Sequence, residues 1–176
     1  MLIWWFRIPK LLKIITAGDG GVGKTTLLYR YVENRFLANT AMTLGVEFFI
    51  KETYIKGETI SLQVWDFGGQ DHFRPLLKDY SVGAKGALLL FDLTRPSSLE
   101  NIEQWVNICR GENPGIPIIF LGTKWDLTES ITVDEKYARS FPNKYGFFKY
   151  LKISSKTGVN VNLAFRLLAK EIIKNL

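Results

Sequence analysis

Short apolar runs alternate with segments of helical periodicity along the chain. The runs at 86–92 and 116–122 are largely apolar, which is typical of strands covered on both faces of a sheet. In the run at 59–67, the alternation of Ile60, Leu62 and Val64 with other residues indicates one buried face. The predicted strands are 11–17, 46–55, 59–67, 86–92 and 116–122, with a hairpin turn at Lys56-Gly57-Glu58 between the second and the third.

Helix signals lie between and after these strands. Residues 25–33 predict a helix directly after the first strand. Ser97 and Glu100 have the spacing of a capping box, which predicts the start of a further helix. Apolar residues recur at helical spacing in that helix and in a last one, at Leu99, Ile102, Val106, Cys109, Val161, Phe165, Leu168 and Ile172. Because Cys109 lies on an apolar helix face, we expect its thiol to be buried and unreactive.

The order of these elements predicts an α/β domain with a mostly parallel sheet, to which the hairpin adds one antiparallel edge strand. A length of 176 residues fits one domain. With 47% hydrophobic and 23% charged residues, the composition is that of a globular protein and not of a disordered one. No apolar stretch approaches the roughly 20 residues of a membrane-spanning helix.

Charge and cysteine content narrow the classes of function. The formal net charge of +6 is spread along the chain without a long basic run, so we expect no nucleic-acid partner. The single cysteine excludes an intrachain disulfide and a zinc cluster built from cysteines. The chain is compatible with a reducing compartment, and we expect a cytoplasmic protein.

Residues 1–10 form an apolar extension before the domain at 11–176. Trp4, Trp5 and Phe6 stand in this extension, which lacks the basic start and the cleavage site of a signal peptide. Two interpretations stay open. The extension is disordered or packs on protein, or it makes weak contact with a membrane interface, where Trp and Phe are favoured. In the second case the protein is peripheral at a membrane.

The segment from Gly18 to Thr25 reads Gly-Asp-Gly-Gly-Val-Gly-Lys-Thr and has the pattern G-x-x-x-x-G-K-[ST]. It lies between a predicted strand and a predicted helix, which is the required context. The glycines allow successive backbone N–H groups to point at phosphate oxygens beside the helix N-terminus. Lys24 would reach the β- and γ-phosphates, and Thr25 would offer its hydroxyl to Mg²⁺. The loop predicts a nucleoside triphosphate but does not identify the base.

Four further segments follow in the order found in small GTPases of the Ras superfamily. Thr43-Leu44-Gly45-Val46-Glu47-Phe48 resembles the first switch of Rab proteins, and Trp65-Asp66-Phe67-Gly68-Gly69-Gln70 resembles the D-x-x-G-Q segment and also the second switch of Arf proteins. Thr123-Lys124-Trp125-Asp126 resembles [NT]-K-x-D, and Ser154-Ser155-Lys156 resembles S-A-K. The likeness runs from residue 11 to the C-terminus. It implies a single P-loop G domain, most like Rab and Ras, with a six-stranded sheet and helices on both faces.

The resemblance implies a guanine site. Asp126 would accept hydrogen bonds from the N1 and N2 groups of guanine, which adenine does not offer at that edge. Lys124 would lie against the base and ribose, and Ser155 would donate its backbone N–H to guanine O6. Phe36 either presents an aromatic edge to the base or anchors its loop in the core. Thr123 replaces the commoner Asn, so we expect weaker or altered support between the base site and the phosphate loop.

The resemblance also implies Mg²⁺ as cofactor and GTP or GDP as ligand. Thr25 and Thr43 would bind Mg²⁺ through their hydroxyls, and Asp66 would bind it through a water. Gly69 would donate its backbone N–H to the γ-phosphate, and Gln70 would orient the attacking water. The expected catalytic residues are Gln70 and Lys24. The expected nucleotide-binding residues are Gly18, Asp19, Gly20, Gly21, Val22, Gly23, Lys24, Thr25, Thr26, Phe36, Thr43, Gly69, Thr123, Lys124, Asp126, Ser154, Ser155 and Lys156.

Departures from relatives bear on the rate of hydrolysis. No Arg occurs in residues 36–43, so this segment supplies no arginine in cis, and we expect unassisted turnover on the order of 10⁻⁴ s⁻¹. The same segment has no Tyr to cover the phosphates, and neither Thr40 nor Met42 is a good substitute. The additional glycine, Gly68, should loosen the second switch. His72 is expected to be exposed and non-catalytic.

We therefore expect a molecular switch in signalling or trafficking that binds GTP or GDP and slowly hydrolyses GTP. The alternative is a nucleotide-loaded interaction module without meaningful hydrolysis. An effector, an exchange factor and a GTPase-activating protein would bind the switch segments around Thr43 and Gln70. Phe48, Trp65 and Tyr80 stand where Rab relatives carry an aromatic triad that effectors contact; the alternative for each is plain packing beside the second switch.

Overall fold

The computed structural model of the chain describes residues 9–70, 74–111 and 113–176. Within these ranges, strands form a six-stranded sheet in the order β2-β3-β1-β4-β5-β6. β2 and β3 pair antiparallel, whereas the other neighbouring strands are parallel. The strands are β1 (Lys10–Ala17), β2 (Val46–Ile55), β3 (Glu58–Phe67), β4 (Gly86–Asp92), β5 (Ile118–Thr123) and β6 (Lys149–Lys152). The predicted α/β class and the antiparallel edge strand are confirmed.

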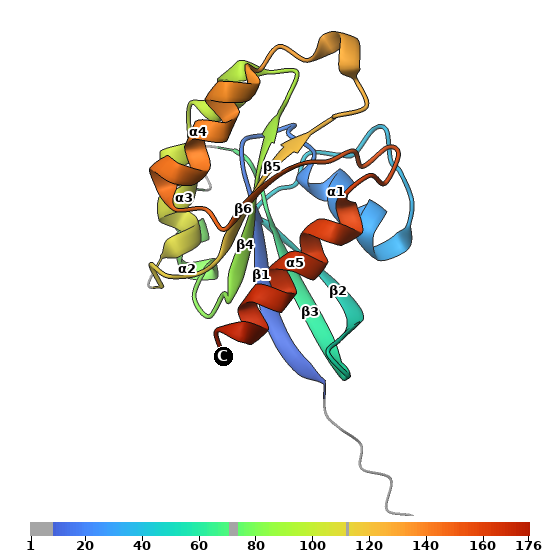
Figure 1. Cartoon of the computed structure of the whole chain (residues 1–176), viewed down its shortest axis with the longest axis vertical. Helices are drawn as coiled ribbons and strands as arrows, with labels where there is room; N and C mark the ends of the chain where they lie inside the picture. The colour runs from blue at the N-terminus through green and yellow to red at the C-terminus, as the bar shows by residue number, and fades with distance from the viewer. Residues whose placement is uncertain (1–8, 71–73, 112) are drawn as a thin grey trace, which may run out of the picture.

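Helices cover both faces of the sheet (Figure 1). α1 and α5 pack on one face, where Tyr31 and Phe165 stack with their ring centroids 3.7 Å apart. α2, α3 and α4 pack on the other face around Trp105, which is fully buried. The helices are α1 (Lys24–Glu33), α2 (Arg74–Tyr80), α3 (Ile102–Arg110), α4 (Glu135–Tyr145) and α5 (Val161–Lys174), with short 3-10 helices η2 (Pro96–Leu99) and η3 (Thr128–Ser130).

Two local predictions hold in detail. The hairpin between β2 and β3 turns at Lys56 and Gly57, which both have positive φ, and Glu58 already belongs to β3. Such a two-residue turn matches the right-handed twist of its strands. Cys109 lies on the inner face of α3 and is 1% exposed. Burial raises the pKa of its thiol to about 12, so the reactive thiolate is absent at neutral pH.

The predicted capping box at Ser97 is wrong. Residues 96–99 form η2, and α3 begins at Ile102 after Asn101, whose side chain makes no capping hydrogen bond. The neighbouring Ser98 is the serine that is used, since its hydroxyl donates to the Arg95 carbonyl at 2.7 Å and accepts from the Asp92 N–H at 2.9 Å. The hydrogen bonds of Ser98 to Asp92 and Arg95 stabilise the turn after β4. The spacing of Ser97 and Glu100 in the sequence does not predict these bonds.

The carboxyl ends of the parallel strands meet at one edge of the sheet, which is where open α/β sheets bind ligands. The loop after β1 leads into α1 there, and the ends of β4 and β5 lie beside it. β1 begins at Lys10, one residue inside the expected extension. The predictions for Trp4, Trp5, Phe6 and His72 concern positions outside the described residues.

Candidate functional site

The loop between β1 and α1 wraps around the ammonium group of Lys24. Its Nζ donates to the backbone carbonyls of Gly18 at 2.7 Å and Asp19 at 3.0 Å. Burial lowers the pKa of Lys24 to about 8, and the carboxylates of Asp66 and Asp19 act in the opposite direction. Gly18 has φ +136°, and a Cβ there would lie 2.3 Å from the Leu90 carbonyl oxygen. The loop therefore needs glycine at this position.

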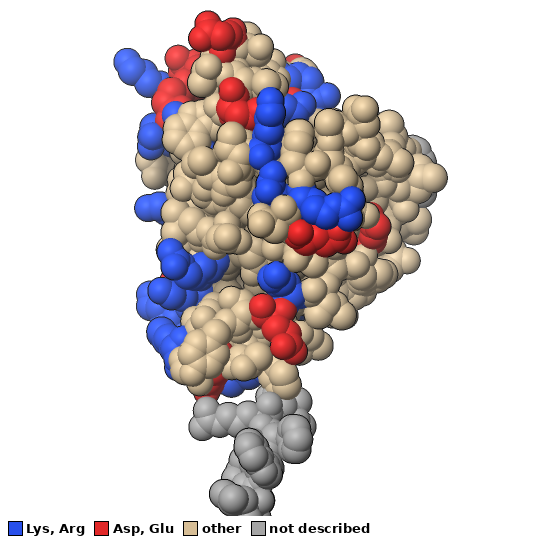
Figure 2. Space-filling model, turned by 90° about the vertical axis from the view of Figure 1, so that its right-hand side faces the viewer, with Lys and Arg blue, Asp and Glu red and all other residues tan. Residues whose placement is uncertain are grey.

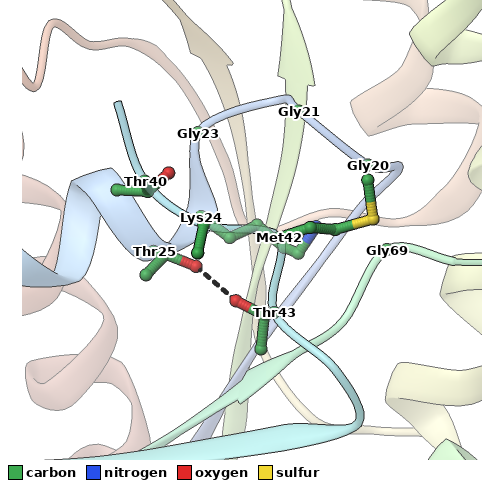
Figure 3. A pocket seen from close by; sticks show the side chains of 10 residues that line it. Gly20, Gly21, Gly23, Lys24, Thr25, Thr40, Met42, Thr43 and Gly69 are labelled. Carbon is green, nitrogen blue, oxygen red and sulfur yellow. Dashed lines mark hydrogen bonds between the residues drawn. The ribbon is translucent and has the colours of Figure 1, made fainter. Parts of the chain in front are cut away.

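A cavity of about 290 Å³ opens above this loop (Figure 3). On the far side it is bordered by the segment that precedes β2. Figure 3 shows that the side chains of Lys24, Thr25 and Thr43 lie close together at its floor. The lining residues are Gly20, Gly21, Gly23, Lys24, Thr25, Thr40, Ala41, Met42, Thr43 and Gly69. Backbone N–H groups at a helix start and one ammonium group make this cavity suited to phosphate.

Three oxygen-bearing side chains converge below the cavity. The hydroxyls of Thr25 and Thr43 lie 2.8 Å apart, and the Thr25 hydroxyl donates to the Asp66 carboxylate at 2.6 Å. Thr16 donates to the other carboxylate oxygen at 2.8 Å. Asp66 is fully buried; burial raises its pKa, while Lys24 and these hydroxyls act in the opposite direction. Residues from α1, β3 and the first switch segment thus meet at one point, as the sequence predicted.

Gly68 and Gly69, which follow β3, lie so close to the backbone of two other segments that a side chain would not fit. The Gly68 N–H donates to the Gly45 carbonyl at 2.8 Å, and a Cβ on Gly68 would lie 2.7 Å from the Thr43 carbonyl oxygen. A Cβ on Gly69 would lie 2.3 Å from the backbone nitrogen of Gly20. Gly68 is hydrogen-bonded and closely packed in this structure, and the expectation that it loosens the second switch concerns motion and stays a prediction.

A second cavity of about 320 Å³ adjoins the first at Gly23. Asp126 stands in its wall, held by a hydrogen bond from the Ser154 hydroxyl at 2.6 Å. The Lys124 ammonium pairs with Asp92 at 2.6 Å, which fixes the lysine stem along the cavity. The lining residues are Val22, Gly23, Thr26, Phe36, Leu37, Ala38, Thr123, Lys124, Asp126, Leu127, Ser155 and Lys156.

The structure shows the contacts of Thr123 and Phe36, two residues that line the second cavity. The Thr123 hydroxyl donates to the Val22 carbonyl at 2.7 Å, so a single hydroxyl ties the two loops, and the expectation of weaker or altered support stays a prediction. Phe36 is 40% exposed and lines the cavity, so it is not a core anchor. Arg30 adds support that sequence reasoning missed, since it donates to the carbonyls of Ser155 at 2.6 Å and Lys156 at 2.7 Å.

Sequence reasoning also missed the side-chain role of Asp19. Its carboxylate accepts hydrogen bonds from Arg74 Nη2 at 2.9 Å, Asn101 Nδ2 at 3.0 Å and Trp105 Nε1 at 2.7 Å. These contacts tie the phosphate loop to α2 and α3. The sequence contained a signal for this role, because a carboxylate within an anion-binding loop requires hydrogen-bond donors from other parts of the fold.

Arg95 is a further residue that sequence reasoning missed. The segment at 36–43 has no arginine, but Arg95, three residues after β4, donates from Nη2 to the Gly20 carbonyl at 2.6 Å. Its position after a parallel strand was the available signal, since such strand ends share one edge of the sheet. The arginine thus braces the phosphate loop from a segment that sequence motifs do not mark.

Phe48, Trp65 and Tyr80 lie side by side. The Phe48 and Trp65 ring centroids are 4.4 Å apart, and those of Trp65 and Tyr80 are 6.0 Å apart. Phe48 and Tyr80 are exposed, and the Lys13 ammonium lies 3.6 Å from the Trp65 ring centroid. The three rings form an aromatic cluster beside the second switch segment, with Trp65 half-buried between the exposed rings of Phe48 and Tyr80.

Residues 13–174 match the model of the Ras family. The chain belongs to the Ras family. Its similarity to Rab-8B of Dictyostelium discoideum is 38% identity over 167 residues, which are 94% of this chain and 82% of that protein. It is 35% identical to RABA1a of Arabidopsis thaliana over 165 residues, 93% of this chain and 76% of the relative. It is 36% identical to Rab-8B of Bos taurus over 167 residues, 94% of this chain and 80% of the relative.

Membership in the Ras family confirms the predicted activity. The protein is a molecular switch that depends on GTP and GDP, and it is a GTP hydrolase. The phosphate loop, the paired hydroxyls and Asp126 lie along two adjoining cavities, as this activity requires. Among the described residues, no helix is both long enough and apolar enough to cross a membrane.

Proposed function

We propose that GTP lies along the two adjoining cavities, with its phosphates at Lys24 and its base at Asp126. The observation that carries the proposal is that Gly23 lines both cavities, so a phosphate-binding end and a carboxylate end lie on the two sides of one residue. Phe36 and the Lys124 stem would cover opposite faces of the base. The Ser155 N–H would then complete guanine recognition together with Asp126.

The site would select guanine over adenine because a bound adenine would leave the Asp126 carboxylate without a hydrogen-bond donor. Asp126 is already oriented by Ser154, and Arg30 holds the carbonyls of the loop that carries Ser155. Guanine offers two N–H donors to this carboxylate, whereas adenine leaves it unpaired. A site built to accept such hydrogen bonds can reject the wrong partner by several orders of magnitude.

The residues below the first cavity fit Mg²⁺. Two hydroxyls and one buried carboxylate within hydrogen-bond distance of each other form the kind of sparse oxygen set that Mg²⁺ uses beside phosphates. Thr25 and Thr43 would hold the ion directly, and Asp66 would hold it through a water. When bound, Mg²⁺ supplies charge stabilisation at the phosphate oxygens.

Catalysis would depend on positioning by this chain's own groups. Lys24 would stabilise charge at the β- and γ-phosphates, and the Gly69 N–H would bind a γ-phosphate oxygen. Gln70 would orient the attacking water for in-line displacement. Thr43 and Gly69 contact the γ-phosphate only in the GTP state, so its loss would release both switch segments.

Partner proteins would bind these two switch segments. The aromatic cluster of Phe48, Trp65 and Tyr80 borders the second switch segment, and the exposed rings of Phe48 and Tyr80 would contact an effector in trafficking, as the similarity to Rab proteins suggests. Exchange and activating proteins would act around Thr43 and Gln70. Figure 2 shows acidic side chains beside basic ones over the middle of the face and basic ones gathered along its left edge. The net charge is only +6 and the sequence has no long basic run, so no nucleic-acid partner is proposed.

The location of the protein in the cell is proposed as cytoplasmic, with peripheral membrane contact through Trp4, Trp5 and Phe6. Trp and Phe favour the interface of a bilayer. Flotation with liposomes, compared between the full chain and a variant lacking residues 1–8, tests this contact. Equal flotation of both proteins contradicts it.

Nucleotide loading tests the assignment of the site. The protein is loaded with labelled GTP and Mg²⁺, and bound GTP and GDP are followed over hours with ATP as competitor. We expect retained GTP, slow conversion to GDP, and no displacement by ATP. Displacement by ATP contradicts the role of Asp126, and retention without conversion contradicts the role of Gln70.

A further inference from the structure

Arg30, on α1, donates hydrogen bonds from all three nitrogens of its guanidinium group. Nε donates to the Ser155 carbonyl at 2.6 Å, and Nη2 donates to the Lys156 carbonyl at 2.7 Å. Nη1 donates to the carbonyl of Asn34 at 3.1 Å, and Asn34 caps the C-terminal end of α1. One side chain therefore joins the loop between β6 and α5 to the end of α1, which lies beside that loop (Figure 1).

The residues that Arg30 holds belong to the wall of the second cavity. Ser155 and Lys156 line this cavity, and so does Phe36, two residues after Asn34. Arg30 itself is not a lining residue of the cavity. Its effect on a bound base would therefore be indirect, through the backbone that it holds.

The backbone of Ser155 is held on both sides. The carbonyl of Ser154 accepts a hydrogen bond from the Gly158 N–H at 2.8 Å, and the carbonyl of Ser155 accepts one from Arg30. A peptide group is planar, so holding the two carbonyls restricts both backbone dihedrals of Ser155 and the direction of its N–H. Arg30 supplies one of these two restraints, and the restrained N–H is the donor proposed for guanine O6.

We propose that Arg30 is a positioning residue for base specificity: it orients the Ser155 N–H and so sets the preference of the site for an oxygen at position 6 of the purine. The inference rests on the proposed role of Ser155. The planar guanidinium presents its donors in a fixed fork, which matches two successive carbonyls, whereas a lysine ammonium is a point charge without this fork. Without the fork the Ser155 N–H would point less directly at its acceptor, and hydrogen bonds weaken steeply with misalignment.

The test compares three nucleotides on the full chain with Mg²⁺. 6-Thioguanosine diphosphate has sulfur, a weaker acceptor, in place of O6, and inosine diphosphate lacks the amino group proposed to face Asp126. Competition against a fluorescent GDP analogue gives the affinity of each nucleotide. For the wild type, we expect both analogues to bind more weakly than GDP.

Arg30→Lys should reduce only one of these two preferences. We expect GDP affinity to fall about fivefold, because the hydrogen bond to O6 is weakened. The preference for GDP over the sulfur analogue should shrink by a similar factor. The preference for GDP over inosine diphosphate should stay at its wild-type value, because Ser154 and not Arg30 orients Asp126.

Two further variants separate geometry from charge and from general effects. Arg30→Gln lacks both the charge and the fork and should show the same pattern as Arg30→Lys, which lacks only the fork. Arg166→Lys makes the same substitution at an exposed position of α5 and should leave all three affinities unchanged. A larger effect of Arg30→Gln on all three nucleotides alike would assign the role to charge and contradict the proposal.

The outcomes distinguish this inference from the function on which it rests. A role of Arg30 in loop stability alone would weaken all three nucleotides by one factor in Arg30→Lys, and this result, or unchanged affinities, refutes the inference while the role of Ser155 stands. If the wild type binds the sulfur analogue as tightly as GDP, no donor selects the oxygen at position 6. The role of Ser155 and the inference about Arg30 are then both refuted.

Discussion

The hydroxyl of Thr123, at the end of β5, donates to the backbone carbonyl of Val22 in the phosphate loop at 2.7 Å. It also lies 3.0 Å from the Phe91 carbonyl, at the end of the neighbouring strand. Thr123 is 3% exposed, so water does not replace these contacts. One small hydroxyl therefore ties the loop proposed to bind the base to the loop proposed to bind the phosphates.

Thr123→Ala should accelerate the release of GDP. The substitution leaves a buried carbonyl without a donor, which costs about 1–3 kcal/mol, so we expect release to become about tenfold faster. Thr123→Ser keeps the hydroxyl and is the matched control, with a rate near that of the wild type. Stopped-flow measurement with a fluorescent GDP analogue gives the release rate of each variant. An alanine variant that releases GDP at the wild-type rate would show that the tie is dispensable.

Asp126→Asn should change the preferred base. The amide offers an N–H donor where the carboxylate offered an acceptor, and xanthine carries a carbonyl where guanine carries its exocyclic amino group. We expect GTP affinity to fall by at least about a hundredfold while XTP becomes the better ligand. Competition between the two nucleotides on the loaded protein measures the change. Equal loss of both nucleotides would instead indicate collapse of the loop.

Gly68→Ala should weaken the GTP state more than the GDP state. The new Cβ would lie 2.7 Å from the Thr43 carbonyl oxygen, so the backbone of the first switch must move. Overpacking of this kind costs about 1–3 kcal/mol, and we expect GTP affinity to fall about tenfold relative to GDP affinity. Thr43 is the proposed reason for the difference, since its contact with the γ-phosphate would exist only in the GTP state.

Gly115→Ala is the control for this glycine. A Cβ at Gly115 meets only the Asn113 side-chain oxygen, at 3.8 Å, which is ordinary contact. The ratio of GTP to GDP affinity should therefore stay at its wild-type value. An equal fall of GTP and GDP affinity in Gly68→Ala would argue against a specific effect on the first switch.

Asp19→Asn should destabilise the fold. Asp19 pairs with Arg74, and the two side chains are only 16% and 10% exposed. The neutral amide has one acceptor oxygen in place of two and no charge for the three donors that contact Asp19, so we expect the free energy of unfolding to fall by about 2 kcal/mol. Urea unfolding of the GDP-bound protein measures it.

Glu33→Gln is the matched control for a surface pair. Glu33 and Arg35 form an ion pair with side chains 40% and 64% exposed. Its loss should change the free energy of unfolding by less than about 0.5 kcal/mol. If Asp19→Asn is as mild as this control, the donors of Asn101 and Trp105 suffice to hold the neutral amide.

Local patterns were enough for much of the fold and for the identity of the site. The alternation of Ile60, Leu62 and Val64 marks one face of β3, and Lys56-Gly57 supplies the positive φ values that the hairpin turn needs. The spacing of glycines before Lys24 and Thr25 specifies a phosphate loop, since each residue acts on a ligand through near neighbours in the sequence. These features are local, so one sequence can reveal them.

Tertiary structure decided what depends on residues distant in the sequence. The partners of Asp19 come from α2 and α3, and Arg95 reaches Gly20 from the segment after β4. Which donor binds which acceptor depends on the positions of both groups in the folded protein. The hydrophobic periodicity of the sequence does not predict these pairings. The sequence by itself determined the chemistry of the phosphate and base sites. Only the packed fold decided which side chains hold those sites in place, because strand ends far apart in the sequence meet at one edge of the sheet.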